Sequence, residues 1–369
     1  MEGATTMVPG GNEPKIVASF EIDFTRLLDI DGSLCGPLPD FAQDQTTLIG
    51  LYRDMVLTRA FDAKAVALQR TGRLGTYAPS LGQEAVSVGL GAAMAPEDVL
   101  LCTYREQGAQ LRRGVTMVEI LRYWGGDESG SNYAGPREDF PICVPVGTHG
   151  PHATGVALAF KLRREPRVAV CAMGDGATSK GDVYEAMNLA GVWQLPVVFV
   201  VANNEWAISV PRARQTACET LAQKAIGAGF PGHQVDGNDV IAVYHVMWDA
   251  LERARAGNGP TLVEALTYRL SDHTTVDDAT RYRDDAEVSA RWKLEPISRL
   301  RRYLIAAGFW TKEDEDRLLS EVGREVEVAV EAYLATPLRP PASMFDHLYA
   351  DLPAPLAEQR TEVEGYGGG

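Results

Sequence analysis

The chain has 369 residues, of which 45% are hydrophobic, so it can build a sizeable core, and its formal net charge is −15. Nucleic-acid binding requires a basic face, so we expect no nucleic-acid partner for so acidic a chain. The apolar runs of the sequence are too short to cross a bilayer, so we also expect no membrane span. Five scattered cysteines without a CxxC pair, and an N-terminus without a signal-peptide pattern, predict a cytoplasmic protein with reduced thiols.

The N-terminal part of the chain predicts an arm followed by a long helix. Residues 1–45 carry clusters of Gly, Pro and Asp and are expected to lie over the surface of a domain. From residue 46 the signal is helical, because Leu48, Leu51 and Met55 recur near helical spacing until Gly72. We expect one α/β domain over 46–345 and a C-terminal tail over 346–369.

The centre of the chain alternates apolar runs with helical segments, the order typical of a parallel α/β sheet. Strands are expected at 167–173, 196–202, 233–237 and 261–269, and helices at 178–193 and 239–257. Asp239 stands where it can cap the second of these helices. Because strands of a parallel sheet are buried on both faces, we predict a central, mostly parallel sheet with helices on both faces. Beyond Arg283 the chain is expected to be helical to about residue 335.

Polar residues follow two of the predicted strands at the point where each strand ends. Asp175 stands between Gly174 and Gly176 after the first strand, and Asn203 and Asn204 follow the next one. Carboxylate and amide oxygens suit a hard cation such as Mg²⁺, and flanking glycines let the backbone approach a diphosphate. A lone GDG, or a lone pair of asparagines, is more often part of an ordinary turn. Their coincidence at the ends of two buried strands predicts a site for a metal and a diphosphate.

The run from 174 to 216 resembles the thiamine diphosphate motif of the alpha subunits of 2-oxo acid dehydrogenase complexes. The resemblance extends from about Leu48 to Gly308 through GRLGTYAPSLGQEA, YREQG, GTHGPHATGVALAFKL and HTTVDDATRYR, and this joint pattern is highly specific. It implies a thiamine diphosphate-binding fold with thiamine diphosphate and Mg²⁺ as cofactors. Within the family the chain is more similar to the pyruvate dehydrogenase type than to the branched-chain type, chiefly through RLGTYAPSLGQEA and TLAQKAIGAGFPG.

The resemblance implies a role for each matching residue at the strand ends. The expected metal ligands are Asp175, the side chain of Asn204 and the backbone carbonyl of Trp206, and the residues expected to lie against the cofactor are Gly174, Gly176 and Ala177.

The remaining implied site residues come from three other segments. Tyr104 and Arg105 would contact the diphosphate, and Val144 and Val146 would face the aminopyrimidine and bend the cofactor. His273 would contact the diphosphate and act as the catalytic-loop histidine. Its loop, 271–285, carries five aspartates and no apolar periodicity, so we expect it to be mobile without cofactor. We expect the loop's arginines to pair with these aspartates once cofactor binds.

The family's activity is the oxidative decarboxylation of a 2-oxo acid, here expected to be pyruvate, with acyl transfer to the lipoyl domain of an acyltransferase. The glutamate that activates the pyrimidine would come from a beta subunit in an α₂β₂ assembly, because this chain has only one GDG–NN unit. Alternatives are the alpha subunit of a branched-chain 2-oxo acid or acetoin dehydrogenase, a transketolase-like half, and a cofactor-free structural subunit.

Overall fold

The computed structural model describes residues 16–366, so the first 15 residues of the predicted arm and the last three of the tail lie outside the described part. At its centre is a six-stranded sheet with the order β1-β7-β8-β4-β3-β2, and each paired strand runs parallel to its neighbour. The strands are β1 (Phe24–Thr25), β2 (Val99–Leu101), β3 (Ala169–Gly174), β4 (Val197–Asn203), β7 (Gly232–Asp236) and β8 (Thr261–Leu266). The predicted parallel α/β sheet is confirmed.

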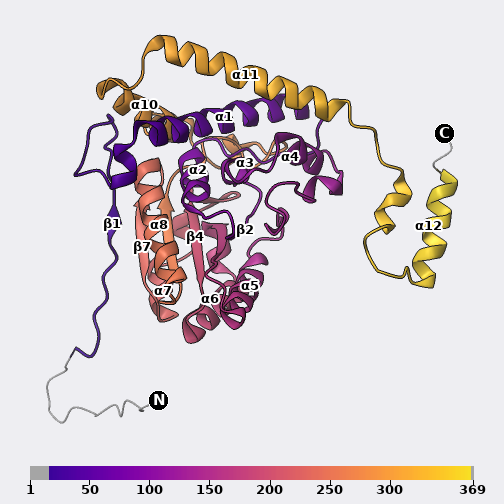
Figure 1. Ribbon diagram of the computed structural model, residues 1–369, viewed down its shortest axis with the longest axis horizontal. Coiled ribbons are helices and arrows are strands. Elements are labelled where there is room, and N and C mark those ends of the chain that lie inside the picture. The colour runs from indigo at the N-terminus through magenta and orange to yellow at the C-terminus, as the bar shows by residue number, and fades with distance from the viewer. Residues whose placement is uncertain (1–15, 367–369) are drawn as a thin grey trace.

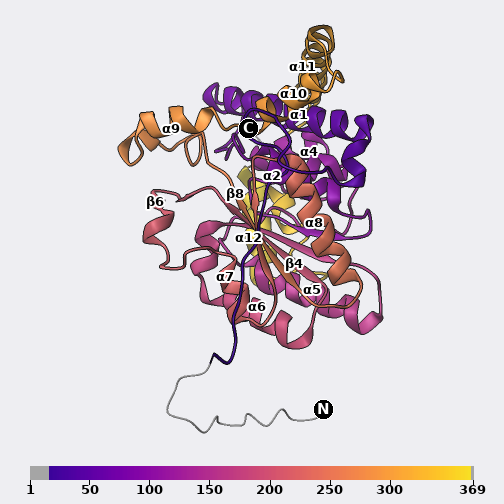
Figure 2. The ribbon, with the colours of Figure 1, turned by 90° about the vertical axis from the view of Figure 1, so that its left-hand side faces the viewer.

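Helices cover both faces of this sheet (Figures 1 and 2). One face packs against α2 (Glu84–Ala93), α3 (Gln107–Arg113) and α8 (Val240–Arg255), and the other against α5 (His149–Arg163), α6 (Gly181–Trp193) and α7 (Gln223–Gly227). Side chains alternate between the faces along a strand: Val170 and Ala172 lie in the first core, and Ala169 and Cys171 in the second. This two-sided burial explains the continuous apolar run in the sequence.

A further layer of helices lies outside α2 and α8. It contains α1 (Gln45–Arg70), α4 (Met117–Trp124), α10 (Pro296–Ala306) and α11 (Lys312–Leu334). Figure 1 shows α1 and α11 side by side along one edge of the molecule. The predicted α1 positions Leu48, Leu51 and Met55 are all buried in this layer. Within residues 16–366, no helix is both long enough and apolar enough to span a bilayer.

The remaining elements are shorter or lie at the periphery. They are the antiparallel pair β5 (Trp206–Ala207) and β6 (Val210–Pro211), the helices α9 (Asp285–Trp292) and α12 (Ala354–Tyr366), and the 3-10 turns η1 (Asp40–Gln43), η2 (Glu128–Ser131), η3 (Asp175–Ser179), η4 (Arg212–Arg214), η5 (Ala279–Arg281) and η6 (Pro341–Phe345). Helix α12 lies away from the sheet in Figure 1.

Three elements differ from the sequence prediction in extent or in role. The arm does not only cover a surface, because Phe24 pairs with Gln234 and adds β1 to the edge of the sheet. The strand expected over 261–269 ends at Leu266. The helix expected from residue 178 begins at Gly181, because the preceding residues form the 3-10 turn η3.

Asp239 caps α8 as predicted and also holds the N-terminal arm. Its Oδ1 accepts hydrogen bonds from the backbone N–H groups of Ile241 and Ala242, at 3.1 and 3.2 Å. Its Oδ2 accepts from the N–H groups of Leu27 and Leu28, both at 2.7 Å. One buried carboxylate therefore satisfies four backbone donors on two segments far apart in the sequence.

We expect Asp239→Ala to lower the free energy of unfolding by about 2–4 kcal/mol, since it removes a helix cap and leaves further N–H groups without an acceptor. Urea unfolding of the purified chain measures this change. Asp44→Ala is the matched control: Asp44 caps α1 through Thr46 and Thr47 in an exposed position, and its loss should cost only about 1 kcal/mol. Equal effects of the two substitutions would contradict the argument.

Candidate active site

The candidate site lies where the carboxyl ends of four parallel strands meet. Strands β3 and β4 pair in a register that sets Gly174 beside Ala202, so Asp175 and Asn204 both emerge at the same edge. Arg105 follows β2, which pairs with β3, and His273 follows β8, which pairs with β4. This edge is where ligands bind in open parallel sheets.

A cavity of about 180 Å³ opens at this edge. The predicted site residues that line it are Tyr104, Arg105, Val146, Gly174, Asp175, Gly176, Ala177, Asn204, Trp206 and His273. Val144 does not line the cavity and is half exposed. The structure thus gathers ten positions from separate segments into one site, and the roles implied for them remain predictions.

The Asp175 carboxylate is 1% exposed and faces a glutamine that the sequence did not reveal. Its Oδ2 accepts a hydrogen bond from Gln215 Nε2 at 2.6 Å. Burial raises the pKa of Asp175, while the bond from Gln215 lowers it. Among the described residues, the buried Oε1 of Gln215 has no hydrogen-bond partner. An oxygen without a donor beside a buried carboxylate suits a cation or its water ligands.

The two consecutive asparagines divide into a structural and a site residue. Asn203 Nδ2 donates to the buried Glu264 carboxylate at 2.7 Å, which fixes the end of β4 against β8. Asn204 turns the other way and donates from Nδ2 to Gln83 Oε1 at 3.0 Å, and its Oδ1 accepts from the Trp206 N–H at 3.2 Å. The Oδ1 atom of Asn204 therefore keeps a lone pair for a further ligand.

The turn that carries Asp175 is held from beneath by a buried lysine. Lys224 Nζ donates to the carbonyl and hydroxyl of Thr178, at 2.7 and 2.9 Å, and that hydroxyl donates to the carbonyl of Asp175 at 2.7 Å. Gly176 is required here, because a Cβ at this position would lie 2.7 Å from the Cβ of Ala207. A Cβ at Gly174, by contrast, would meet no protein atom within 4 Å. Protein packing therefore leaves the space beside Gly174 open.

His273 is held by Arg105, and this contact fixes its tautomer. Arg105 Nη2 lies 2.9 Å from His273 Nδ1 and also donates to the His273 carbonyl. A guanidinium only donates hydrogen bonds, so Nδ1 must accept and the ring proton sits on Nε2. Burial, together with the charges of Arg105 and Arg269, lowers the pKa of His273 to about 4. At neutral pH the histidine is therefore an uncharged donor through Nε2–H.

The two arginines behind the histidine are buried without carboxylate partners in the described part of the chain. Arg105 Nη1 donates to the carbonyl of Pro79 at 2.6 Å, and Arg269 Nη2 donates to the carbonyl of Ile208 at 2.8 Å. Burial and the charge of Arg105 lower the pKa of Arg269 to about 10. Carbonyl dipoles compensate these charges only in part, so the site retains an affinity for an anion.

In this structure the polar side chains of the loop 271–285 bind backbone groups, and the pairing of its arginines with its aspartates, expected once cofactor binds, stays a prediction. Arg283 donates to the carbonyls of Arg269 and Ser271. Aspartate side chains of the loop accept from backbone N–H groups: Asp272 from Ala279, Asp277 from His273, Asp278 from Thr280 and Asp284 from Ala286. The acidic residues therefore shape the loop itself.

Sequence reasoning missed four residues that support the site, namely Gln83, Gln215, Lys224 and Arg269. All four lie inside segments that the sequence already singled out, so a search for polar residues within them could have found these positions: Gln83 in SLGQEA, Gln215 in the run 174–216, Lys224 in TLAQKAIGAGFPG and Arg269 at the end of the predicted strand 261–269. Which atoms of the site they contact carries no local signal, because Gln215 and Lys224 each contact it from a position about 40 residues away or more.

The donor set fits a divalent cation bound together with a diphosphate. Asp175 and Asn204, which can offer oxygen ligands, line the cavity, and Gln215, whose Oε1 has no partner among the described residues, contacts Asp175. Trp206 lines the same cavity, and its carbonyl accepts a long bond of 3.4 Å from Arg269. Arg105 and His273 also line the cavity and could donate N–H groups to phosphate oxygens.

Known proteins are similar to this chain over most of its length. Residues 52–341 match the family model described as "Dehydrogenase E1 component". The chain is 44% identical to 3-methyl-2-oxobutanoate dehydrogenase subunit alpha of Mycobacterium tuberculosis over 86% of this chain and 87% of that one. It is 41% identical to the pyruvate dehydrogenase E1 component subunit alpha of Acholeplasma laidlawii over 87% and 93%, and 38% identical to that of Staphylococcus epidermidis over 94% and 97%.

We expect His273 to titrate far below an ordinary histidine. Its folded pKa of about 4 lies below the usual 6.5, so an unfolded chain binds the proton first. The stability that His273 contributes is therefore present above pH 6.5 and is lost as the pH falls toward 4. Histidine-selective NMR of the cofactor-free chain, with His273→Gln to assign the signal, measures the midpoint and the Nε2–H tautomer. A midpoint near 6.5 would contradict the burial argument.

Proposed function

The chain belongs to the dehydrogenase E1 component family, and from that membership we propose that it is the alpha subunit of a thiamine diphosphate-dependent 2-oxo acid dehydrogenase. The proposed reaction is the oxidative decarboxylation of pyruvate, with transfer of the acyl group to a lipoyl domain of an acyltransferase. The cysteines are free thiols in the structure, which suits the cytoplasm proposed for the enzyme.

One observation carries this proposal: the oxygen-bearing side chains of Asp175 and Asn204 and the buried guanidinium of Arg105 line one cavity at the carboxyl ends of adjacent parallel strands, and a second buried guanidinium, that of Arg269, lies behind His273. Asp175 and Asn204 offer oxygen to a cation, while Arg105 and its neighbour Arg269 have no carboxylate to neutralise them in the described structure. A cation alone would leave the arginines uncompensated, and an anion alone would face Asp175. A diphosphate bound through Mg²⁺ satisfies both requirements.

The proposed roles follow from the contacts of each residue. Asp175, Asn204 and the Trp206 carbonyl would hold Mg²⁺, with Gln215 orienting the carboxylate of Asp175. Arg105 and Tyr104 would bind the diphosphate, and His273 would donate its Nε2 proton to a phosphate oxygen or to the reacting acyl group.

Thiamine diphosphate, when bound, supplies the nucleophilic carbon and the electron sink that decarboxylation of a 2-oxo acid requires. The chain's part is to anchor, orient and desolvate it. Val146 offers an apolar surface in the cavity wall for the organic part of the cofactor, as the resemblance implies.

A second subunit is proposed because the cavity is open and none of the described residues places a free glutamate there. Val146 and Ile208 line the cavity yet are 43% and 54% exposed, which suits a surface that a partner covers. Glu106 also lines the cavity, but its Oε2 accepts from the N–H and hydroxyl of Thr103, both at 2.7 Å. We therefore propose that a beta subunit supplies the glutamate that activates the pyrimidine in an α₂β₂ enzyme.

A branched-chain substrate is the second candidate, favoured by the relative named for 3-methyl-2-oxobutanoate at 44% identity. The two substrates differ only in the alkyl group on the 2-oxo carbon. An apolar pocket discriminates by about 1–3 kcal/mol per methylene, so both compounds can be substrates with different kcat/KM.

We expect Asp175→Asn to weaken Mg²⁺-dependent binding of thiamine diphosphate by at least about 100-fold, because loss of one charge from a buried set typically costs about 3–5 kcal/mol. Isothermal titration of the α₂β₂ enzyme measures the affinity. Asp182→Asn is the matched control, since Asp182 is only partly buried in the first turn of α6 and pairs only with Lys180 among the described side chains. Unchanged affinity in Asp175→Asn would remove the metal assignment.

We expect the purified chain to be inactive by itself and to gain activity with its beta subunit, since half of the site is proposed to lie on the partner. Steady-state assays of the reconstituted pair with an artificial electron acceptor should then give kcat/KM for pyruvate at least about tenfold above that for 3-methyl-2-oxobutanoate. The reverse order would transfer the substrate assignment to the branched-chain acid. Turnover by the chain alone would overturn the need for a partner.

A further inference from the structure

A buried aspartate that no part of the proposed mechanism uses lies behind the site. Asp62 is on α1 and is 3% exposed. Its Oδ1 accepts from the hydroxyl of Tyr77 at 2.5 Å, and its Oδ2 accepts from the N–H and the hydroxyl of Ser80, at 2.6 and 2.9 Å. Burial raises the pKa of Asp62 to about 7, and these hydrogen bonds oppose that rise. Three hydrogen-bond donors from the short segment 77–80 therefore compensate the Asp62 carboxylate on α1.

The segment that Asp62 holds, residues 77–80, supports the histidine loop by direct backbone pairing. The N–H of Tyr77 donates to Thr275 Oγ1 at 3.0 Å, and the N–H of Thr275 donates to the Tyr77 carbonyl at 2.9 Å. Thr275 lies two residues after His273. The position of the histidine thus depends on where Tyr77 lies.

The same segment also fixes the arginine that holds the histidine. The carbonyl of Pro79 accepts from Arg105 Nη1 at 2.6 Å, while Nη2 of the same guanidinium contacts His273. Two independent connections, through Thr275 and through Arg105, therefore run from residues 77–80 to His273.

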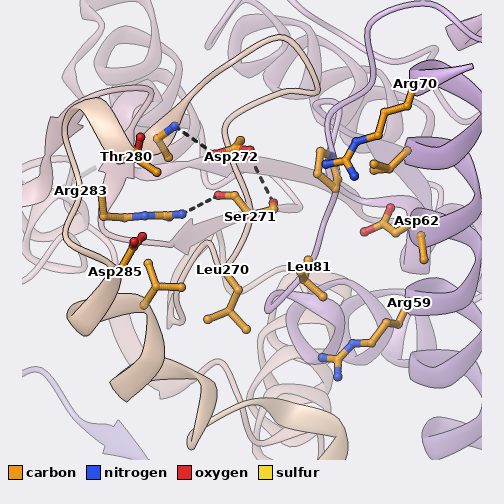
Figure 3. Close-up of a pocket in the computed structure, with 15 residues that line it drawn as sticks. Arg59, Asp62, Arg70, Leu81, Leu270, Ser271, Asp272, Thr280, Arg283 and Asp285 are labelled. Atoms are coloured by element: carbon orange, nitrogen blue, oxygen red, sulfur yellow. Dashed lines mark hydrogen bonds between the residues drawn. The ribbon is translucent and has the colours of Figure 1, made fainter. Parts of the chain in front are cut away.

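A second cavity, of about 530 Å³, lies between α1 and the loop. Figure 3 shows Arg59, Asp62 and Arg70 of α1 on one side of this cavity and Ser271, Asp272, Thr280 and Arg283 on the other. Within residues 16–366, no hydrogen bond or ion pair joins α1 directly to residues 271–285. The polar connection from the helical layer to the loop passes through residues 77–80.

We propose that Asp62 is a positioning residue for the histidine loop: through Tyr77 and Ser80 its carboxylate fixes Arg105 and Thr275, which together hold His273 at the cavity. The inference rests on the proposed function in one respect, that His273 and Arg105 face a bound diphosphate. The connection from Asp62 to the loop stands on contacts within this chain alone.

The test compares two substitutions at Asp62. Asp62→Leu keeps the number and branching of the side-chain heavy atoms and removes both acceptor atoms. Asp62→Asn is the conservative rescue, because its carbonyl can still accept from Ser80 and its amide can donate to the Tyr77 hydroxyl, which can reverse its role. Asp54→Leu is the matched control, since Asp54 lies on the same helix and pairs with Arg112 and Arg53, away from residues 77–80.

The first readout is amide hydrogen exchange of the full chain without cofactor. We expect peptides covering residues 271–285 to exchange about tenfold faster or more in Asp62→Leu, near the wild-type rate in Asp62→Asn, and at the wild-type rate in Asp54→Leu. Unchanged exchange in Asp62→Leu overturns the proposal whatever the enzyme binds. If Asp62→Leu does not fold, Thr275→Val tests the same connection, because it removes only the acceptor for the Tyr77 N–H.

The second readout uses the α₂β₂ enzyme with thiamine diphosphate and Mg²⁺. We expect Asp62→Leu to weaken cofactor affinity about tenfold or more while the KM for the 2-oxo acid stays the same. Simple loss of folded protein would lower kcat in proportion to the active fraction and leave the cofactor affinity unchanged, and that result would overturn the positioning role. If wild-type enzyme fails to bind the cofactor, the proposed function fails, whereas the exchange experiment still decides the role of Asp62.

Discussion

The parallel pairing of β3 with β4 is the constraint on which the site depends. Because both strands run in the same direction with Gly174 beside Ala202, the residues that follow them leave the sheet at one edge. The neighbouring pairs β2–β3 and β4–β8 bring the segments with Arg105 and His273 to the same edge. A slip in this register would move Asp175 along the edge relative to Asn204 and separate the oxygen donors. The helices on both faces keep the register fixed by burying alternate side chains of each strand.

The protein compensates the buried charges of the site only in part. Asp175 is compensated by a neutral glutamine, and Arg105 and Arg269 by backbone carbonyls. Neutral partners stabilise each charge without cancelling it, so negative and positive charges remain within one cavity and do not form an ion pair with each other in the described structure. Such a site favours a ligand that carries both signs, as a metal diphosphate does.

A second set of residues keeps this unbalanced site rigid. Glu264, inside β8, accepts from Asn203 at the end of β4, from Gln234 in the middle of β7 and from the N–H groups of Leu221 and Ala222, which anchors these strands to the segment before α7. Lys224, from α7, then supports the turn of Asp175. On the other side, Asp62 holds the segment beneath Arg105. Buried charged side chains that are hydrogen-bonded within the protein therefore surround a site whose own charges remain available to a ligand.

The sequence alone determined the α/β class, the positions of β3, β4, β7 and α8, the cap at Asp239 and the placement of Asp175 and Asn204 after their strands. These features follow from local signals, since hydrophobic periodicity and turn chemistry act over a few residues. Tertiary structure alone decided that the arm adds β1 to the sheet and that β8 ends at Leu266. It also decided the partners Gln215, Gln83 and Asp62. Their contacts join residues 40, 121 and 15 positions apart, and which distant side chains meet depends on the packing of helices against the sheet, for which no local pattern exists.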